Sequence, residues 1–239
     1  MTEYVSLTRF VRPLLLEHAT GPWRFSRSGS CFLLLYKGNP YAITAKHVIR
    51  DHPHARLSVM LDLDTPQVEC APIRHPFTFI HYGNEDFEDF LVAPIDRTAM
   101  SAAHLDLFFP YISVEAGHFQ VNAQNYLIVA GYPDERAEMD VEPPSVSFQA
   151  VLLRGESVTS DCADMMYTLT LASDGGLSSF SGLSGAPVFA HSADNLVRVV
   201  GIVLRGHPAN RICHFLDIRV ILAGIERHLE HCSAPSNSP

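Results

Sequence analysis

Gly182-Leu183-Ser184-Gly185-Ala186-Pro187 sets a serine between two glycines, directly ahead of the apolar run that begins at Val188. A serine hydroxyl is a poor nucleophile until a neighbouring base takes its proton. Glycines on both sides permit a tight loop with unusual dihedral angles and a close approach of a ligand to the backbone. The N–H groups of Gly182 and Ser184 would then be the natural donors to an oxyanion. A glycine-rich turn without chemistry is the alternative for this segment taken alone.

A base for Ser184 is offered much earlier in the chain, by Thr44-Ala45-Lys46-His47-Val48. Histidine suits proton transfer because its ordinary pKa lies near neutrality. The chain has 13 histidines, so a structural role would be the better prediction for His47 alone. Its position ahead of an acid and of the Ser184 loop favours a general base.

An acid that could orient His47 opens the apolar stretch Asp89-Phe90-Leu91-Val92. A carboxylate in this role holds the imidazole in one tautomer and stabilises the imidazolium. Asp86 competes with Asp89 inside the same acidic run, and we prefer Asp89 because the apolar strand starts directly after it. The order His, Asp, Ser matters because unrelated folds that use this triad place its members differently along the chain.

The composition is that of a globular protein with a substantial core: 239 residues, 47% hydrophobic and 18% charged. The formal charge is −9 and no basic run is visible, so neither nucleic acid nor an anionic membrane surface is an expected partner. Residues 1–6 carry no signal-like apolar region, and the longest apolar runs fall well short of the ~20 residues of a membrane helix. The five cysteines form no CxxC pair, so we expect reduced thiols and a cytoplasmic location.

Neither a metal nor a cofactor is predicted. His228, His231 and Cys232 lie close together in the sequence, but no complete set of ligands accompanies them, so an exposed helix end is the better interpretation. Asp51-His52-Pro53-His54 is likewise expected to be a loop.

Short apolar runs separated by turn residues predict an all-β barrel or sandwich. Strands are expected over 30–37, 41–44, 55–63, 77–81, 90–95, 125–130, 145–153, 165–171, 186–190 and 197–204. Apolar residues recur at helical spacing over 217–231, which predicts a C-terminal amphipathic helix. A similar spacing over 6–17 favours a short N-terminal helix, although Pro13 interrupts it.

With these residues the chain resembles the trypsin/chymotrypsin-like serine proteases, and more closely their bacterial and viral members. The family segments Thr-Ala-x-His, Asp-Φ-Φ-Φ and Gly-x-Ser-Gly-x-Pro match 44–47, 89–92 and 182–187. Residues 126–133 look like the strand that opens the second barrel of the family, and 200–206 like the strand that pairs with the substrate backbone.

The resemblance covers residues 23–231 and implies two six-stranded antiparallel β-barrels, with a C-terminal α-helix and a short N-terminal helix. The implied organisation is a helical extension over 1–22, an N-terminal barrel with the His and the Asp over 23–105, a crossing between barrels over 106–122, a C-terminal barrel with the Ser and the substrate pocket over 123–216, a helix over 217–232 and a disordered tail over 233–239.

Two departures from the family concern its control. Val48 follows the histidine where secreted relatives carry a cysteine, so Cys31 has lost its usual disulfide partner. Leu183 stands before the nucleophile where zymogen-activated relatives keep an aspartate that binds a newly cut N-terminus. Activation by clipping is therefore not expected, and control would come from a protein partner, an oligomer or the loops.

A third departure concerns specificity. Ser178 lies six residues before the nucleophile, in place of the aspartate that makes trypsin choose basic side chains, so a Lys/Arg preference has no support. The resemblance implies that the primary pocket is lined by Ser178, Ser179, Leu204, Arg205 and Gly206. Arg205 and His207 near this edge would favour an acidic or polar side chain.

The function expected from the sequence is an intracellular serine endopeptidase that cleaves protein substrates through an acyl-enzyme, as a regulated effector in stress or defence. The alternative is a catalytically silent protease fold that holds peptides or proteins. An α/β-hydrolase esterase fails on the order of the triad, and it also needs Gly-x-Ser-x-Gly where this chain has Ala186.

Overall fold

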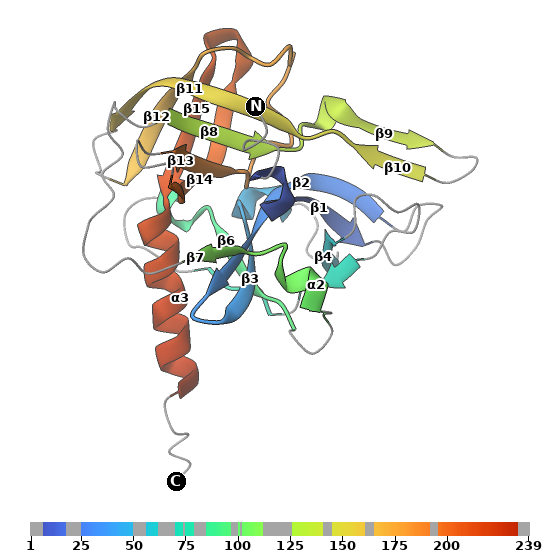
Figure 1. Cartoon of the computed structure of the whole chain (residues 1–239), viewed down its shortest axis with the longest axis vertical. Helices are drawn as coiled ribbons and strands as arrows, with labels where there is room; N and C mark the ends of the chain where they lie inside the picture. The colour runs from blue at the N-terminus through green and yellow to red at the C-terminus, as the bar shows by residue number, and fades with distance from the viewer. Residues whose placement is uncertain are drawn as a thin grey trace.

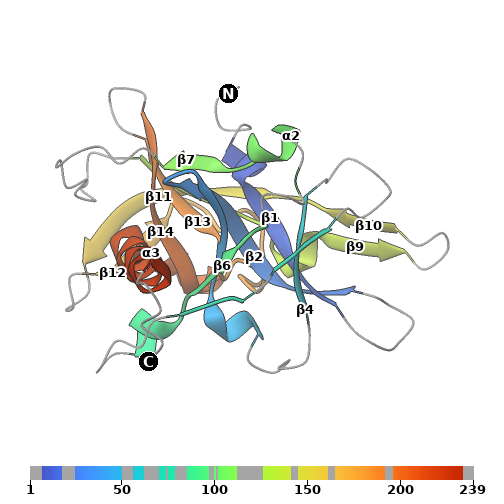
Figure 2. The same ribbon diagram turned by 90° about the horizontal axis from the view of Figure 1, so that it is seen from below.

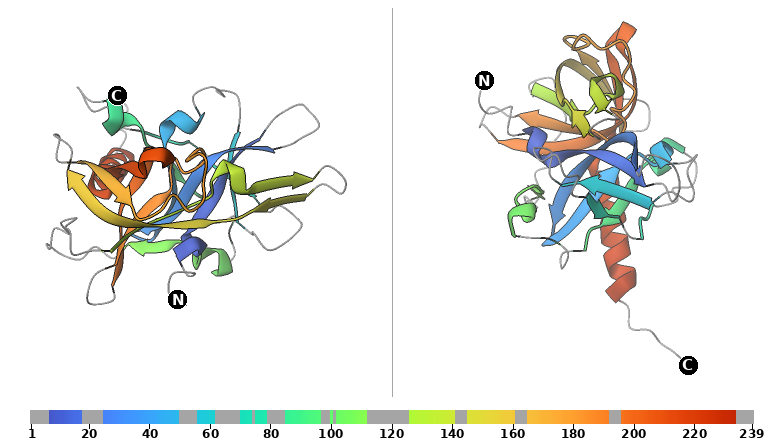
Figure 3. Two further views of the ribbon diagram at one scale, coloured as in Figure 1. Left: turned by 90° about the horizontal axis from the view of Figure 1, so that it is seen from above. Right: turned by 90° about the vertical axis from the view of Figure 1, so that its right-hand side faces the viewer.

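Two β-sheets, one closed and one curled, make up most of the chain (Figure 1). The computed structural model describes residues 7–17, 25–49, 56–61, 70–73, 75–78, 85–96, 100, 102–111, 126–140, 145–160, 165–191 and 196–233. The closed sheet lies above the curled one in Figure 1, and the right-hand view of Figure 3 shows the same two layers from the side.

The closed sheet is a six-stranded antiparallel barrel with the strand order β11-β12-β15-β14-β13-β8. Its strands are β8 (Tyr126–Gly131), β11 (Val151–Ser160), β12 (Met166–Leu171), β13 (Pro187–His191), β14 (Val197–His207) and β15 (Ile212–Asp217). Buried residues from every strand fill the interior, including Val129, Leu153 and Phe215. The Ser184 loop lies between β12 and β13, so this barrel carries it.

The curled sheet has the order β5-β4-β1-β2-β3-β6, with β7 paired in parallel to β2. Its strands are β1 (Val11–Glu17), β2 (Phe25–Tyr36), β3 (Asn39–Thr44), β4 (Arg56–Met60), β5 (Cys70–Pro72), β6 (Leu91–Pro94) and β7 (Phe109–Tyr111). The prediction of a mostly β chain with a barrel is confirmed. Where a second closed six-stranded barrel was expected, the described residues form a seven-stranded half-barrel.

The strands expected over 30–37 and 41–44 are confirmed and form a hairpin. Strands β2 and β3 pair up to Tyr36 and Asn39, and Lys37 and Gly38 make the turn with φ of 49° and 76°. Positive φ at both central residues is the geometry that joins antiparallel strands without splaying them. This hairpin delivers residue 44 to the start of the His47 segment.

The helix predicted over 6–17 is wrong for most of its length. Only Leu7–Phe10 form a short 3₁₀ helix, η1, and the next seven residues form β1 between β2 and β4. Leu14, Leu15 and Leu16 are all buried, so β1 shows no alternation of apolar and polar residues. A continuous apolar run of this kind can match helical spacing by chance. The N-terminal sheet therefore begins at Val11, ahead of the boundary at residue 23.

Other strand predictions differ in detail. The single strand expected over 145–153 is split into β10 (Ser145–Phe148) and β11, and β10 pairs with β9 (Ala137–Asp140) as a two-stranded hairpin that projects from the barrel (Figure 2). Phe77 forms only an isolated bridge with Val92, and 79–81 lie outside the described residues. Most of the crossing over 106–122 and of the tail over 233–239 also lies outside them.

The C-terminal helix predicted over 217–232 is confirmed as α3 (Ile218–Ser233). It leaves the barrel after β15 and runs along the half-barrel (Figures 1 and 3), where Glu226 accepts hydrogen bonds from Tyr36 and Lys37 and His228 stacks on Phe77. The remaining helices are short: η2 (Lys46–Ile49), η3 (Glu85–Glu88), α2 (Ala102–Leu105), η5 (Asp134–Arg136) and η6 (Pro208–Asn210). Across the described residues, no helix combines the length and the apolar character needed to span a membrane.

Candidate active site

His47 and Asp89 are brought together by the pairing of β3 with β6. The last residue pair of that ladder joins Thr44 to Leu91, so the segments that follow β3 and precede β6 lie side by side. His47 Nδ1 lies 2.7 Å from Asp89 Oδ2, and the His47 backbone N–H donates to Asp89 Oδ1 at 2.8 Å. Because Nδ1–H donates to the carboxylate, Nε2 is left as an acceptor. The side chain of Asp86 lies outside the described part of the chain.

Ser184 completes a hydrogen-bonded chain across the two sheets. Its Oγ lies 2.9 Å from His47 Nε2 and 3.1 Å from the carbonyl oxygen of Leu204 on β14. The hydroxyl has one proton and two acceptors within reach, and Nε2 is the nearer. A proton can therefore pass from Ser184 to an imidazole whose opposite nitrogen is held by Asp89.

The loop around Ser184 depends on its two glycines. Gly182 and Gly185 have φ of +87° and +84°. Residues that carry a Cβ rarely adopt this backbone conformation. Gly185 N–H donates to Val203 O at 2.8 Å and Leu183 N–H to Phe180 O at 3.1 Å. Among the described residues, no backbone acceptor is found for the N–H groups of Gly182 and Ser184, the two groups predicted to bind an oxyanion.

Ser30 on β2 fixes this loop against the half-barrel. Its N–H donates to Ser184 O at 3.0 Å and its Oγ donates to Gly182 O at 2.7 Å. The same Oγ accepts the Tyr132 N–H at 2.9 Å, so one buried hydroxyl joins three segments. The nucleophile loop is thereby attached to the sheet that carries His47.

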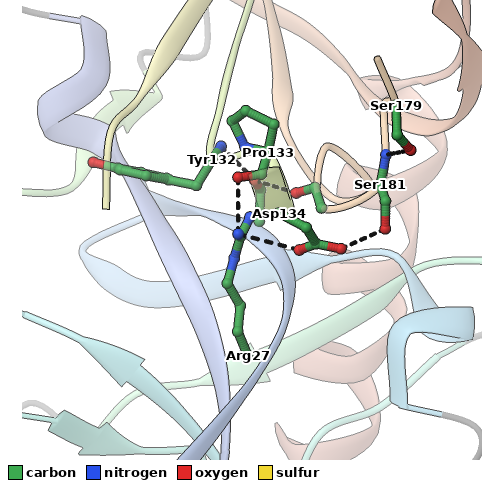
Figure 4. A network of polar contacts seen from close by, with 8 residues as sticks. Arg27, Tyr132, Pro133, Asp134, Ser179 and Ser181 are labelled. Atoms are coloured by element: carbon green, nitrogen blue, oxygen red, sulfur yellow. Dashed lines mark hydrogen bonds and ion pairs between the residues drawn. The ribbon is translucent and has the colours of Figure 1, made fainter. Parts of the chain in front are cut away.

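An ion pair between a buried arginine and an exposed aspartate supports the other side of the loop (Figure 4). Arg27 on β2 donates to Pro133 O at 2.8 Å and pairs with Asp134 at 3.1 Å, while only 5% of its side chain is exposed. Asp134 N–H donates to Ser181 O at 2.9 Å, and the Ser181 hydroxyl donates back to the Asp134 carboxylate. Burial lowers the pKa of Arg27, and Asp134 opposes that shift.

Gly182 is packed against this ion pair. A Cβ at Gly182 would overlap Arg27 Nη2 and lie 2.6 Å from Asp134 Oδ1, so the loop backbone passes directly over the guanidinium. Arg27 Nε and Nη2 are buried and have no hydrogen-bond partner among the described residues. The sequence analysis missed Arg27 and Asp134, because nothing in their local sequence indicates that they meet.

The residues expected to line the primary pocket are split between two walls. Ser178 and Ser179 are exposed, and Ser178 N–H and Oγ donate to the Glu135 carboxylate at 3.0 and 2.5 Å. These hydrogen bonds lower the pKa of Glu135. On the other wall Leu204 is buried, whereas Arg205 and Gly206 are exposed near the end of β14.

Phe180 follows Ser179 on the first of these walls and packs towards Gly206 on the second, and it was not predicted from the sequence. Its side chain is buried, and a Cβ at Gly206 would lie 2.8 Å from Phe180 Cδ2 and 3.1 Å from Cys213 Sγ. The signal in the sequence is that Phe180 is the only apolar residue in the serine-rich stretch from Ser178 to Ser181.

Other potentially reactive groups lie apart from His47, Asp89 and Ser184. Burial raises the pKa of the free thiols of Cys31 and Cys213 to about 12, so both stay protonated at neutral pH. No cluster of three or more His, Cys, Asp or Glu that could hold a metal ion occurs in the described ranges. A cavity of about 410 Å³ lies on β8 and β11, lined by Tyr126, Ile128, Leu152 and Arg154, none of which is a predicted site residue.

Comparison of the chain with protein-family models and with curated proteins gives no match. The fold itself, with one closed barrel, a curled half-barrel and a single long C-terminal helix, is consistent with the trypsin-like fold that the motifs indicate.

Proposed function

We propose that this chain is a trypsin-like serine endopeptidase. One observation carries the proposal: His47 lies within hydrogen-bond distance of both Ser184 Oγ, at 2.9 Å, and Asp89 Oδ2, at 2.7 Å. The three residues come from separate segments in the order that the trypsin-like proteases use. The free buried thiols suit a reducing compartment, so we assign the enzyme to the cytoplasm.

In the proposed mechanism Ser184 Oγ attacks the carbonyl carbon of a peptide bond as its proton moves to His47 Nε2. Asp89 holds the imidazole and stabilises its charged form. The N–H groups of Gly182 and Ser184 stabilise the oxyanion of the tetrahedral intermediate. His47 then gives the proton to the leaving amine, which departs and leaves an acyl group on Ser184. Water, deprotonated by His47, releases the acid and restores the serine.

An extended peptide has an edge to pair with beside this triad. The β13–β14 ladder ends at Pro187 and Ile202, while β14 continues to His207 and stays paired with β15. Beyond Val203, no strand of the described sheet pairs with the side of β14 that faces away from β15. Main-chain pairing to such an edge is a general way of holding a peptide independently of its sequence. We propose that this edge binds substrate.

A fluorophosphonate probe tests the function without a known substrate, because it reacts only with an activated serine. We expect covalent labelling of the wild type at Ser184, no labelling of Ser184→Ala, and very slow labelling of His47→Ala. Cleavage of unfolded casein should fall by roughly 10⁴–10⁶-fold in the serine variant. Ser157→Ala, at an exposed serine on β11, is the matched control. A wild type that binds peptides but never reacts would instead be a silent binding module.

A further inference from the structure

The position of the substrate side chain follows from the proposed function, on which this inference rests. The attacked carbonyl must come within reach of Ser184 Oγ, which itself lies 3.1 Å from Leu204 O. A peptide paired with the side of β14 that faces away from β15 then directs the side chain on the acyl side of the cleaved bond between two walls. One wall is the loop from Ser178 to Ser184, and the other is the strand from Leu204 to Gly206.

Phe180 belongs to the first of these walls and packs against Gly206 in the second. Its Cδ2 would lie 2.8 Å from a Cβ on Gly206, and Cys213 Sγ on β15 would lie 3.1 Å from the same point. The space beside Gly206 is therefore filled by the protein's own ring and sulfur. A glycine at 206 is needed because the backbone oxygen of Ile212 and the ring of Phe180, each 2.8 Å from the Cβ position, leave no room for a methyl group.

Moving the Phe180 ring out of the barrel core would cost free energy. Phe180 is 5% exposed and belongs to the core of the closed barrel, together with Leu177, Leu183 and Phe215. Its carbonyl oxygen accepts the Leu183 N–H at 3.1 Å, one residue before the nucleophile. Moving the ring into water would expose a large apolar surface and disturb the turn that carries Ser184.

We propose that Phe180 closes the primary pocket and restricts the enzyme to substrates with a small residue, Gly, Ala or Ser, on the acyl side of the cleaved bond. Phe180 is thus a specificity-determining residue. A small-residue preference would take the place of the acidic or polar preference expected from Arg205. The ring of Phe180 would exclude a large side chain before that side chain could reach the charge of Arg205.

The experiment uses a library of peptides from a digested proteome, with cut sites identified by mass spectrometry. Cuts are counted only when they are absent from the Ser184→Ala digest. We expect wild-type cuts after small residues and a shift towards Leu, Met and Phe in Phe180→Ala. The ratio of kcat/KM for Leu over Ala peptides should rise by roughly 100-fold, since each methylene that a pocket accepts or rejects changes discrimination by about 10–200-fold.

Leu177→Ala is the matched control, because Leu177 is a buried apolar residue of the same loop and of the same core as Phe180. Leu177→Ala should destabilise the barrel as Phe180→Ala does. Its cleavage specificity should stay that of the wild type, with cuts after small residues. If Phe180→Ala does not fold, Phe180→Leu should give the same shift in smaller measure.

The outcomes separate this inference from the proposed function. Ser184-dependent cuts after large residues in the wild type, or an unchanged profile in the folded Phe180 variants, would overturn the inference and leave the peptidase standing. The absence of any Ser184-dependent cut would overturn both.

Discussion

The two partners of the Arg27–Asp134 ion pair differ in burial: 5% of the Arg27 side chain is exposed to solvent, and 50% of the Asp134 side chain. The two partners therefore differ in what happens when the other loses its charge. A carboxylate left alone at the surface is solvated by water, whereas a cation left alone under Gly182 is not. The pair is an asymmetric support for the nucleophile loop.

The first prediction at the residue scale compares the two halves of this pair. Asp134→Asn should lower the free energy of unfolding by about 2 kcal/mol, because it leaves a buried charge without its counter-charge and the half exposure of Asp134 reduces the penalty. Arg27→Met should cost about 1 kcal/mol or less, because an apolar side chain of similar length replaces a charged group in which two nitrogen atoms, Nε and Nη2, have no hydrogen-bond partner among the described residues. Urea unfolding measures both. A larger loss in Arg27→Met than in Asp134→Asn would contradict this account of the pair.

At the scale of elements, α3 is attached to the half-barrel through Glu226. Hydrogen bonds from Lys37 and from Tyr36 lower the pKa of Glu226, the lysine contributing more. A carboxyl whose folded pKa lies below its unfolded value stabilises the fold above the unfolded value. That contribution is lost as the pH falls through the folded pKa.

We therefore expect wild-type stability to fall between about pH 5 and pH 3, and the fall to be shallower in Glu226→Gln. The urea midpoint measured across this range gives the slope for each protein. Glu230→Gln, an exposed position on the same helix, should keep the wild-type slope. Parallel slopes for the wild type and Glu226→Gln would mean that this contact does not hold α3 to the sheet.

The elements also show what the sequence could predict. Most of the expected strands were found because they end at clear turns, as β2 and β3 do at Lys37 and Gly38. Strand β1 was mistaken for a helix because both of its faces are buried, which removes the alternation that identifies a strand. Strand β15 was not predicted, although residues 212–217 pair on both sides within the barrel.

The residues of the candidate site likewise fall into those that the sequence could predict and those that it could not. His47, Asp89 and Ser184 lie in local motifs whose residues already indicate chemistry, so their meeting could be predicted before any coordinates. Phe180, Arg27 and Asp134 matter only through neighbours more than 20 residues away, such as Gly206 for Phe180 and Gly182 for Arg27. Contacts of that kind are set by the packing of the two sheets, which no single segment encodes.

At the scale of the whole molecule, the two sheets meet where Gly185 faces β2 and β3. A Cβ on Gly185 would overlap the carbonyl oxygen of Ser30 and the hydroxyl of Thr44, and would lie 3.0 Å from the Ala45 nitrogen. Thr44 Oγ1 donates to Ser30 O at 2.8 Å, so the half-barrel offers a rigid polar surface here. The close approach of the sheets is what brings Ser184 to His47.

Gly185→Ala should therefore separate the halves of the site. The positive φ alone costs roughly 1–2 kcal/mol for a residue with a Cβ. The overlap with Ser30 and Thr44 adds to this, so we expect a total loss above about 4 kcal/mol, in the range of the most disruptive single substitutions. Fluorophosphonate labelling should be lost in whatever fraction stays folded, because the shift needed to admit the methyl group moves Ser184 away from His47.

Gly38→Ala is the control that isolates the role of the junction. Gly38 has a φ of +76°, close to that of Gly185, but no atom lies within 4 Å of its Cβ position. It should lose only the backbone cost of roughly 1–2 kcal/mol and keep wild-type labelling. Urea unfolding and the fluorophosphonate labelling rate are measured for both variants. Equal losses of unfolding free energy in the two variants would show that Gly185 is required for its backbone conformation alone. The contact between the sheets would then tolerate a methyl group.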